Sequence, residues 1–407
     1  MKVIIIGGGA GGMMAALSAA AEPNNRVTIL ERQNRVGKKL MATGNGRCNL
    51  SNLGANISHY HGQQPEFIRP AMQLLDVQKT LELFHKLGLY TVSEESGKVY
   101  PLSDQANSVV DTLRFALEQH GVNIVTSCDV LHVAKKARGY QIETTGEKYF
   151  ADKLIIACGG CAGKSLGGTR SGYMLLSSLG HSCTELHPSL VQVKTDLTFV
   201  RSLKGVRADC TMTLKSCGST LAQTFGEVQF TDFGVSGPVT FELSRAVSVC
   251  NSDMVLLLDF LRSYTEDEAL SALRERTACF PDLTAEQLLT GMLNTRLGLA
   301  VVKFAGIDIH TNLADLTKEQ LRQAAHSIKY FPLKVEGTLG MEHAQVTAGG
   351  VPTCEFRADT LESRLAPGVF AVGEVLDIDG DCGGFNLQWA WSSGYLAGKL
   401  GRIEEGL

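Results

Sequence analysis

The sequence lacks the marks of several protein classes. No apolar run approaches the roughly 18 residues that a membrane-spanning helix needs, and no internal repeat or low-complexity tract occurs. The 11 cysteines are an odd number without regular spacing, which indicates reduced thiols and not a disulfide framework. The net charge of −4 gives no overall signal for nucleic-acid binding. We therefore expect a cytoplasmic enzyme whose 407 residues form two or three domains.

A glycine-rich fingerprint stands near the N-terminus. Gly7, Gly9 and Gly12 have the spacing G-x-G-x-x-G and follow the β-branched run Val3–Ile6. Gly7 permits a tight turn, Gly9 lets the backbone approach a pyrophosphate, and Gly12 lets the next helix pack closely. The same glycines interrupt the first apolar stretch, so a secretory leader is not expected.

The segments after the fingerprint complete a βαβ unit. An alanine-rich helix, Met13–Ala21, would direct its N-terminal N–H groups at phosphates. The strand Val27–Leu30 ends at Glu31, where a carboxylate can accept hydrogen bonds from ribose hydroxyls. The order strand, glycines, helix, strand and acid predicts a dinucleotide site.

A second glycine-rich segment, Gly37–Asn52, is too rich in glycine for regular structure. It combines exposed backbone N–H groups with the cations Lys38, Lys39 and Arg47, which suits a phosphate or a flavin edge. A solvated turn is the alternative.

A third segment, Gly368–Gly394, predicts the return of the chain to the same site. A strand, Val369–Val372, precedes Glu374, and a helix runs from Phe385 to Lys399. The N-terminus of that helix would stabilise an anionic reduced flavin. Asp377, Asp379 and Asp381 alternate nearby, but no histidine lies close in sequence, so we expect no metal.

Between these segments the pattern changes. Helices are expected over 67–75, 78–87 and 107–120, and strands over 122–125, 130–133, 140–144 and 153–157. Short alternating strands over 190–194, 210–215, 220–224 and 227–231 indicate a small β-domain or barrel. Residues 264–327 read as helical, with cap signals at Thr265 and Thr284. We expect three domains. An FAD-binding domain is formed by residues 1–188 and 346–407, an inserted β-domain by residues 189–262 and 331–345, and a helical domain by residues 263–330.

Motifs along the whole chain resemble one family. GGGAGG, GKKLMATGNGRCNLSN, TDFGVSGP, VTAGGV, TLESRLAPGVFAVGEVLDIDG and GGFNLQWAWSSGYLAG occur in order. Together they resemble the BaiN/RdsA-like family of NAD(P)/FAD-dependent oxidoreductases, which includes aminoacetone oxidase-like flavoproteins.

The resemblance implies an α/β fold: a discontinuous Rossmann-type FAD-binding domain with an inserted β-barrel-like domain and a helical domain. It also implies varied activities, namely reduction of uridine to dihydrouridine in ribosomal RNA, bile-acid side reactions and aminoacetone oxidation. The motifs predict the flavin and leave the substrate open.

The segments above supply the candidate cofactor-binding residues. They are Gly7, Gly9, Ala10, Gly11, Gly12, Glu31, Arg32, Lys38, Lys39, Thr43, Gly44, Arg47, Asn49, Val130, Gly159, Gly373, Glu374, Asp379, Gly384, Phe385, Asn386 and Leu387.

The sequence contains no second dinucleotide fingerprint that would bind an electron donor. GGCAG at 159–163 and GGTRSG at 167–172 lack the spacing or a preceding strand, so no second Rossmann half is expected. NAD(P)H would then dock transiently at the flavin, or another donor or acceptor would serve. The flavin carries the hydride chemistry, and the protein supplies orientation and electrostatics.

Reduction of a C=C bond needs a hydride on one carbon and a proton on the other, and a positioned thiol can supply the proton. Cys48 and Cys382 are candidates for this role, although packing is the role that we favour for each, and His343 is the histidine we would test. Cys158 and Cys161 form a C-x-x-C pair, for which we favour packing over a disulfide reductase.

The function therefore stays open between two classes. One is an enzyme that oxidises a small amine or reduces an activated alkene with NAD(P)H. The other is an RNA-modifying reductase that docks ribosomal RNA on a modest basic cluster, Arg201, Lys204, Arg207 and Lys215. A flavin sensor without turnover is a weaker third option, and the sequence leaves the oligomeric state undetermined.

Overall fold

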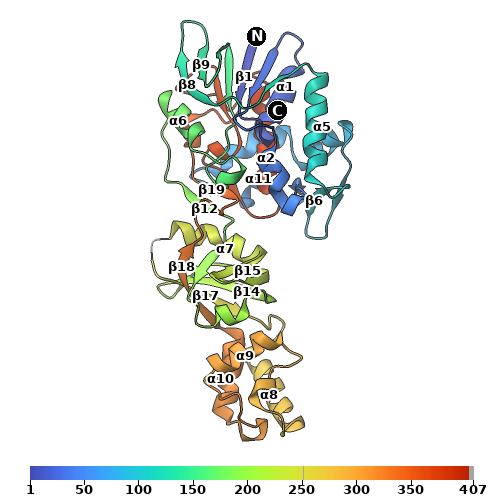
Figure 1. Cartoon of the computed structure of the whole chain (residues 1–407), viewed down its shortest axis with the longest axis vertical. Coiled ribbons are helices and arrows are strands. Elements are labelled where there is room, and N and C mark those ends of the chain that lie inside the picture. Colours follow the sequence, from blue (N-terminus) through green and yellow to red (C-terminus); the bar gives the residue numbers. More distant parts are fainter. Residues whose placement is uncertain (251, 403–407) are drawn as a thin grey trace. The chain divides into compact units, whose positions relative to one another are not determined.

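The computed structural model describes residues 1–250 and 252–402. The chain divides into two compact units: unit 1 is Met1–His187 with Gln345–Leu407, and unit 2 is Pro188–Ala344. Unit 2 is therefore an insertion, and the two end segments of the chain fold together in unit 1 (Figure 1). No helix in the described ranges is long and apolar enough to cross a membrane.

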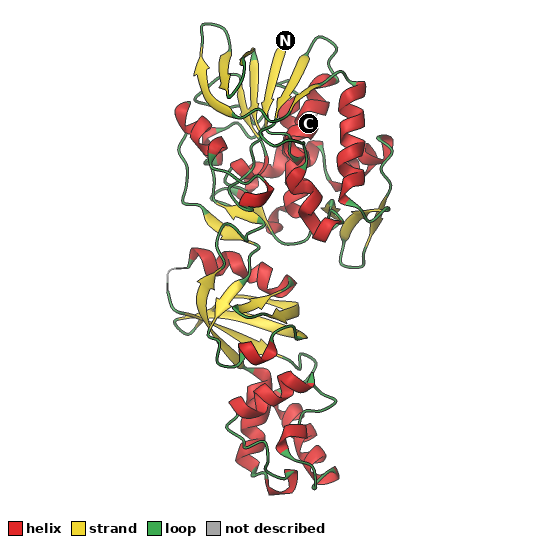
Figure 2. Ribbon diagram, in the orientation of Figure 1, coloured by secondary structure: helices red, strands yellow, loops and turns green. Residues whose placement is uncertain are grey.

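A five-stranded parallel sheet forms the centre of unit 1, in the order β20-β11-β1-β2-β7 (Figure 2). Its first strand is buried from Val3 to Ile6, as expected for a parallel strand covered on both faces. The strands are β1 (Lys2–Ile6), β2 (Arg26–Leu30), β7 (Asn123–Val125), β11 (Lys153–Ile156) and β20 (Val369–Ala371). The last strand comes from the C-terminal segment, so the sheet itself joins both ends of the chain.

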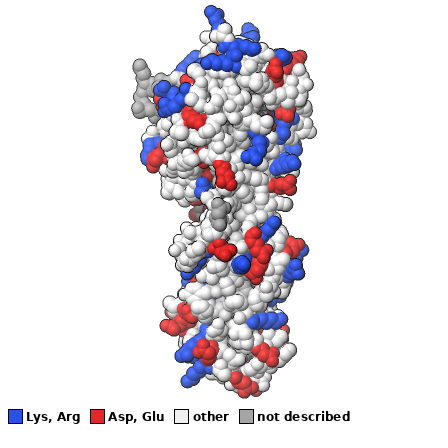
Figure 3. All heavy atoms as spheres, turned by 90° about the vertical axis from the view of Figure 1, so that its left-hand side faces the viewer, with Lys and Arg blue, Asp and Glu red and all other residues white. Residues whose placement is uncertain are grey.

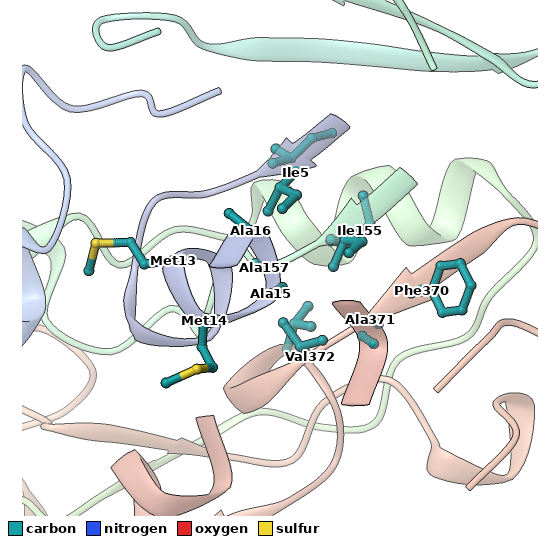
Figure 4. Packing of buried hydrophobic residues seen from close by; sticks show 14 of the residues in the cluster. Ile5, Met13, Met14, Ala15, Ala16, Ile155, Ala157, Phe370, Ala371 and Val372 are labelled. Atoms are coloured by element: carbon teal, nitrogen blue, oxygen red, sulfur yellow. The ribbon is translucent and has the colours of Figure 1, made fainter. Parts of the chain in front are cut away.

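Helix α1 (Ala10–Ala20) packs directly against helix α11 (Phe385–Gly398). The Ser18 hydroxyl donates to the Tyr395 carbonyl at 2.8 Å. A Cβ on Gly394 would lie 2.4 Å from the Gly11 carbonyl oxygen, so the two backbones touch at this point. Figure 4 shows the adjoining core, in which side chains of β1 and α1 meet those at the end of β20.

The remaining elements of unit 1 surround this centre. The helices are α2 (Lys38–Ala42), α3 (Arg69–Leu74), α4 (Val77–Lys86), α5 (Ala106–Gln119) and α6 (Ser171–Ser178). The strands are β3 (Ser51–Asn52), β4 (Tyr60–His61), β5 (Thr91–Ser93), β6 (Lys98–Pro101), β8 (Val130–Lys135), β9 (Tyr140–Thr144), β10 (Lys148–Ala151), β19 (Val346–Ala348) and β21 (Asp379–Gly380). Strand β12 (His187–Ser189) lies where the chain passes from unit 1 to unit 2.

One expectation for unit 1 is wrong. The segment Gly37–Asn52, expected to lack regular structure, contains α2 and the 3-10 turn Thr43–Gly46. The reason is that its glycines lie on either side of the helix, Gly37 before it and Gly44 and Gly46 after it, so the stretch Lys38–Ala42 is free of them. Elements α6, β5, β6 and β10 were not expected either, because each is too short for a periodic pattern of apolar residues to show.

Unit 2 contains a closed barrel in the order β13-β16-β15-β14-β17-β18, which confirms the expected barrel-like domain. Two strands were expected over residues 220–224 and 227–231, but the structure has one continuous strand there, β15. The helix α7, which follows β16, was not expected. The strands are β13 (Val193–Thr195), β14 (Arg207–Ser216), β15 (Ser219–Phe230), β16 (Gly234–Ser236), β17 (Met254–Asp259) and β18 (Phe331–Thr338). The helices are α7 (Pro238–Val249), α8 (Glu266–Cys279), α9 (Thr295–Phe304) and α10 (Lys318–Lys329).

The barrel and the helical segment of unit 2 share one core. Phe331 of β18 packs against Phe304 of α9 and against Phe199, with ring centroids 5.2 and 5.9 Å apart. Lys329 at the end of α10 is buried, and its ammonium donates to Asp259 of β17 at 2.7 Å. The expected capping boxes at Thr265 and Thr284 are both present.

Candidate active site

The glycine fingerprint lies between β1 and α1. Gly7 has φ +105°, and a Cβ there would lie 2.4 Å from the Ala157 carbonyl oxygen. A Cβ on Gly12 would lie 1.9 Å from the Gly7 oxygen. Around Gly9, in contrast, no atom lies within 4 Å of the Cβ position. Gly7 and Gly12 are thus required by packing, whereas Gly9 borders open space at the N-terminus of α1, where a pyrophosphate can approach the backbone.

Glu31 holds the end of β2 beside this fingerprint. Its carboxylate accepts one hydrogen bond from the Gly8 N–H and another from the Gln33 N–H, both at 2.7 Å. These bonds fix the orientation of the carboxylate, and its remaining lone pairs can accept hydrogen bonds from ribose hydroxyls. Arg32 donates to the Gly167 carbonyl at 3.1 Å, and Lys38 donates to the Gln33 side chain at 3.0 Å. Both of these predicted cofactor ligands thus have partners within the protein.

Lys39 and Glu374 form an ion pair, although they are 335 residues apart. The Lys39 ammonium lies 2.7 Å from Glu374, whose other oxygen accepts the Thr347 N–H at 2.9 Å. A Cβ on Gly160 would lie 2.3 Å from the same carboxylate. The pair therefore ties α2 to the end of β20. The role of Thr347 gave no signal in the sequence, because it depends on this long-range contact.

The N-terminus of α11 forms the other side of the candidate site. Its first turn follows Gly383 and Gly384, which have φ +126° and +101°, and no side chain caps it. The Asn386 side chain accepts from the Gly380 N–H at 2.8 Å and donates to the Gly380 carbonyl at 2.7 Å. The turn before the helix is thereby fixed, while the first N–H groups carry the partial positive charge that an anionic ligand would meet.

A buried acceptor lies next to this helix start. The Asn49 side-chain oxygen is buried without a hydrogen-bond partner. It lies 2.9 Å from the position that a Cβ on Gly384 would occupy. A buried orphan acceptor is costly unless a ligand donates to it. Together with the open space at Gly9, this atom fits a bound flavin dinucleotide.

The chain after Asn49 runs along α11. Ser51 donates to the Gln388 side chain at 2.7 Å, and the Asn52 amide donates to the Gly383 carbonyl at 2.9 Å. The Trp391 indole donates to the Leu50 carbonyl at 2.9 Å. Trp389 is buried too and donates to the Gly373 carbonyl at 3.2 Å. These bonds place the second and third glycine-rich segments side by side.

Some predicted cofactor residues have mainly structural contacts. The Arg47 side chain is exposed and forms ion pairs with Asp104 and Glu94. Its guanidinium carbon lies 4.0 Å from the centroid of the Tyr100 ring. Thr43 donates to the Leu40 carbonyl at 2.6 Å. The remaining predicted cofactor residues lie at the ends of elements or in turns. Ala10 and Gly11 are in the first turn of α1, Phe385 and Leu387 are in the first turn of α11, Val130 begins β8 in the core, and Asp379 is buried in β21. Gly44 and Gly373 have φ of +57° and +68°, and Gly159 borders open space.

The predicted proton donors differ in their surroundings. Cys48 is fully buried, and burial raises the pKa of its thiol to about 12, which favours packing. Cys382 is half-buried, two residues before the N-cap of α11. His343 is exposed in unit 2. A different group was missed: His59 and His61 of the β4 region both contact Asp381. The spacing H-x-H could have revealed it, because alternate residues of a strand share a face.

The C-x-x-C pair carries no disulfide. Cys158 donates toward the Ile6 carbonyl at 3.6 Å, and burial raises the pKa of its thiol to about 12. The Cys161 N–H donates to the Thr347 hydroxyl at 3.0 Å. A thiol with a raised pKa is a poor nucleophile, which favours the packing interpretation.

The double replacement Cys158→Ser with Cys161→Ser should leave reduction of the bound flavin by NAD(P)H nearly unchanged. Serine is close in volume, and its hydroxyl can donate to the Ile6 carbonyl in place of the thiol. Stopped-flow absorbance of the flavin measures the rate, with the flavin content as the folding control. Loss of reduction at full flavin content would establish a redox role for the pair.

The fold and the site define a Rossmann-type oxidoreductase. The chain belongs to the HI0933-like protein Rossmann domain family, whose model matches residues 1–400. It is 40% identical over 377 residues to a 3-dehydro-bile acid delta(4,6)-reductase from Clostridium scindens, which covers 92% of each chain. It is 28% identical to a ribosomal RNA dihydrouridine synthase from Haemophilus influenzae, again over 92% of each chain.

A further relative and one solved structure are similar. The ribosomal RNA dihydrouridine synthase of Escherichia coli is 28% identical over 93% of this chain and 92% of that one. The 3-ketosteroid-delta4-(5alpha)-dehydrogenase of Rhodococcus jostii RHA1 is 14% identical, with a TM-score of 0.49 over 98% of this chain and 97% of that one. The chain is thus an enzyme, an FAD-dependent oxidoreductase.

Proposed function

We propose that the enzyme reduces a C=C bond conjugated to a carbonyl group in a small molecule, with an enone of the bile-acid or steroid type as the substrate class. The main support is the relative named 3-dehydro-bile acid delta(4,6)-reductase, whose 40% identity extends over 92% of this chain and therefore includes the inserted unit 2. The similarity to this relative thus spans both units of the chain.

The residues of unit 1 fit FAD. The open backbone at Gly9 and the N-terminus of α1 would hold the pyrophosphate, and Glu31 the adenosine ribose. Asn49 and the uncapped N-terminus of α11 would hold the flavin end. When bound, the reduced flavin supplies a hydride to the substrate. The protein supplies orientation, positive potential at the helix start and a proton.

NAD(P)H is proposed as the electron donor. The sequence holds a single G-x-G-x-x-G, at Gly7 to Gly12, which the FAD would occupy. The nicotinamide would therefore dock transiently and leave after the flavin is reduced. We propose that the reaction takes place in the cytoplasm, where reduced nicotinamide and reduced cysteines are both maintained.

Uridine of ribosomal RNA is the second candidate substrate. Two relatives are named ribosomal RNA dihydrouridine synthase, and uracil also carries a C=C bond conjugated to a carbonyl. The surface of unit 2 gives this candidate less support. Lys204 pairs with Asp232 at 2.8 Å and Arg207 with Glu227 at 3.1 Å. On the face that Figure 3 shows, acidic and basic residues are interspersed over unit 2.

A single comparison tests the two candidates. The FAD-loaded enzyme is reduced anaerobically with NADH or NADPH and then mixed, still without oxygen, either with a 3-oxo bile acid that carries double bonds at positions 4 and 6 or with unmodified ribosomal RNA. We expect rapid reoxidation of the flavin by the bile acid and a product heavier by two hydrogens. Reoxidation by ribosomal RNA alone, with dihydrouridine as the product, would overturn the proposal in favour of the second candidate.

Charge reversal in unit 2 provides an independent test. The variant Arg201→Glu, Lys204→Glu, Arg207→Glu should keep its bile-acid reductase activity and its FAD content, because these residues lie in unit 2 and two of them are paired with carboxylates on the surface. The wild type should show no salt-dependent affinity for ribosomal RNA fragments. Affinity that falls steeply with salt in the wild type, and is lost in the variant, would instead indicate phosphate contacts.

A further inference from the structure

Two histidines of unit 1 share one carboxylate. His59 Nδ1 lies 2.9 Å from one oxygen of Asp381, and His61 Nε2 lies 2.6 Å from the other. The side chains of both histidines are about one third exposed, at 35% and 36%, whereas Asp381 is 26% exposed. Each imidazole therefore has one nitrogen fixed by the carboxylate and an edge that solvent or a ligand can reach.

The backbone holds this His59–Asp381–His61 cluster in place. Strand β4 pairs with β21, so that Tyr60 stands opposite Gly380, and the Asp381 N–H donates to the His59 carbonyl at 3.0 Å. The Asn386 amide donates to the Asp381 carbonyl at 3.2 Å. Burial alone would raise the pKa of Asp381, but the hydrogen bonds from His61 and His59 outweigh it and lower the pKa. Asp381 is thus a fixed anion between the two imidazoles.

The cluster lies at the start of α11. The His59 ring stacks on the ring of Phe385, the first residue of the helix, with centroids 4.3 Å apart and planes at 17°. Gly384, next to Phe385, is the residue beside which the Asn49 oxygen is buried without a partner. The unpartnered acceptor of Asn49 and the partly exposed imidazole of His59 therefore flank the same helix N-terminus, where we propose that the flavin end binds.

We propose that His59 is the acid that delivers a proton to the substrate carbon, and that Asp381, which His61 also contacts, positions it. The assignment rests on the proposed function, which supplies the hydride and the substrate class. His59 is preferred over His61 because its ring contacts α11 directly. The thiol of Cys48, in contrast, is fully buried.

The proposed step adds one hydride and one proton across the C=C bond. The hydride, with its electron pair, forms a C–H bond at the carbon remote from the carbonyl. The π electrons of the C=C bond move to the carbon next to the carbonyl, which takes the proton from His59 Nε2. The imidazolium becomes a neutral imidazole that still donates its Nδ1–H to Asp381, and solvent returns the proton. NAD(P)H is the reductant that restores the hydride donor.

Other titratable groups face the cluster from the elements packed against it. Tyr60 stands between the two histidines, and its hydroxyl donates to the Phe385 carbonyl at 3.1 Å; burial first, and the charge of Asp381 second, raise its pKa. Asp377 accepts the Gln63 N–H at 3.1 Å, and Asp379 stands opposite His61 in the strand pair. Cys382 follows Asp381 in sequence.

The kinetic test separates the two half-reactions. In FAD-loaded His59→Gln, reduction of the flavin by NAD(P)H should match the wild type, while reoxidation by the dienone bile acid should slow on the order of 100-fold or more. Its pH profile should lose the fall in rate at high pH that deprotonation of the imidazole causes. His132→Gln, an exposed histidine of β8, is the matched control and should change neither rate. Equal reoxidation rates in His59→Gln and the wild type would overturn the assignment.

A second readout does not depend on turnover. Imidazole resonances of the FAD-loaded protein are followed by NMR with and without the dienone bile acid. We expect the His59 signal, assigned with His59→Gln, to move on binding, and this movement to shrink in Asp381→Asn, because the carboxylate no longer fixes the ring. A His59 signal indifferent to the ligand would sink the assignment whatever the kinetics show. Movement of the signal without reoxidation would support the contact while the proposed function fails.

Discussion

Replacement of Gly9 with valine should abolish FAD binding while the chain stays folded. No atom lies within 4 Å of the Cβ position, so a side chain meets nothing in the protein itself. The backbone at Gly9 is extended, with φ −80° and ψ −169°, which valine adopts without strain. The side chain would instead fill the space through which a pyrophosphate approaches the N-terminus of α1.

The measurement is the flavin absorbance of the purified variant, with the thermal midpoint of the FAD-free protein as the folding control. Gly146→Val is a matched variant, because Gly146 lies in the turn between β9 and β10 and its Cβ position has only one atom nearby, at 4.0 Å. It should retain a full complement of FAD. A Gly9→Val protein that purifies yellow would show that the pyrophosphate does not lie at this glycine.

The change with the largest expected effect on stability is Gly394→Ala. Alanine inside a helix normally stabilises by roughly 1 kcal/mol relative to glycine. Here the new Cβ would lie 2.4 Å from the Gly11 carbonyl oxygen and 3.1 Å from the Met14 side chain. The obstacle is backbone of α1, so α1 and α11 must separate. We expect a net loss of about 1–3 kcal/mol in the free energy of unfolding, as for other overpacked cores.

Urea unfolding of unit 1, followed by the fluorescence of Trp389 and Trp391 on α11, measures this loss directly. Gly146→Ala, in its open turn, is the control and should be close to neutral. FAD should also bind less tightly to Gly394→Ala, because α1 and α11 carry the two helix N-termini of the site. A variant more stable than the wild type would mean that the two helices are not in contact.

Much of the cofactor site could be predicted from sequence because its signals are local. The run Val3–Ile6, the glycines after it and Glu31 lie within 31 residues, and each is constrained by its own turn or strand. The structure gives Gly7 and Gly12 the close contacts that their spacing predicts. Capping boxes at Thr265 and Thr284 were equally visible, because a cap involves residues only three apart.

What the sequence did not reveal depends on pairs far apart in the chain. Lys39 and Glu374 were each expected to contact the cofactor, but their contact with each other requires the fold. His59 and His61 acquired a role only when Asp381 came between them, 320 residues or more away. The strand β15 was divided in error because the local pattern weakens near Gly226, which pairing with β14 keeps inside the strand.

The sequence by itself determined the cofactor class, the order of the segments and the presence of an inserted barrel, because these follow from spacings of a few residues and from the alternation of apolar side chains. The tertiary structure decided which predicted residues meet. It brought α11 onto α1 through glycine-to-backbone contact, and it assembled the orphan acceptor Asn49 and the His59–Asp381–His61 cluster around one helix start. Such contacts depend on loop closure over hundreds of residues, for which no local pattern carries information.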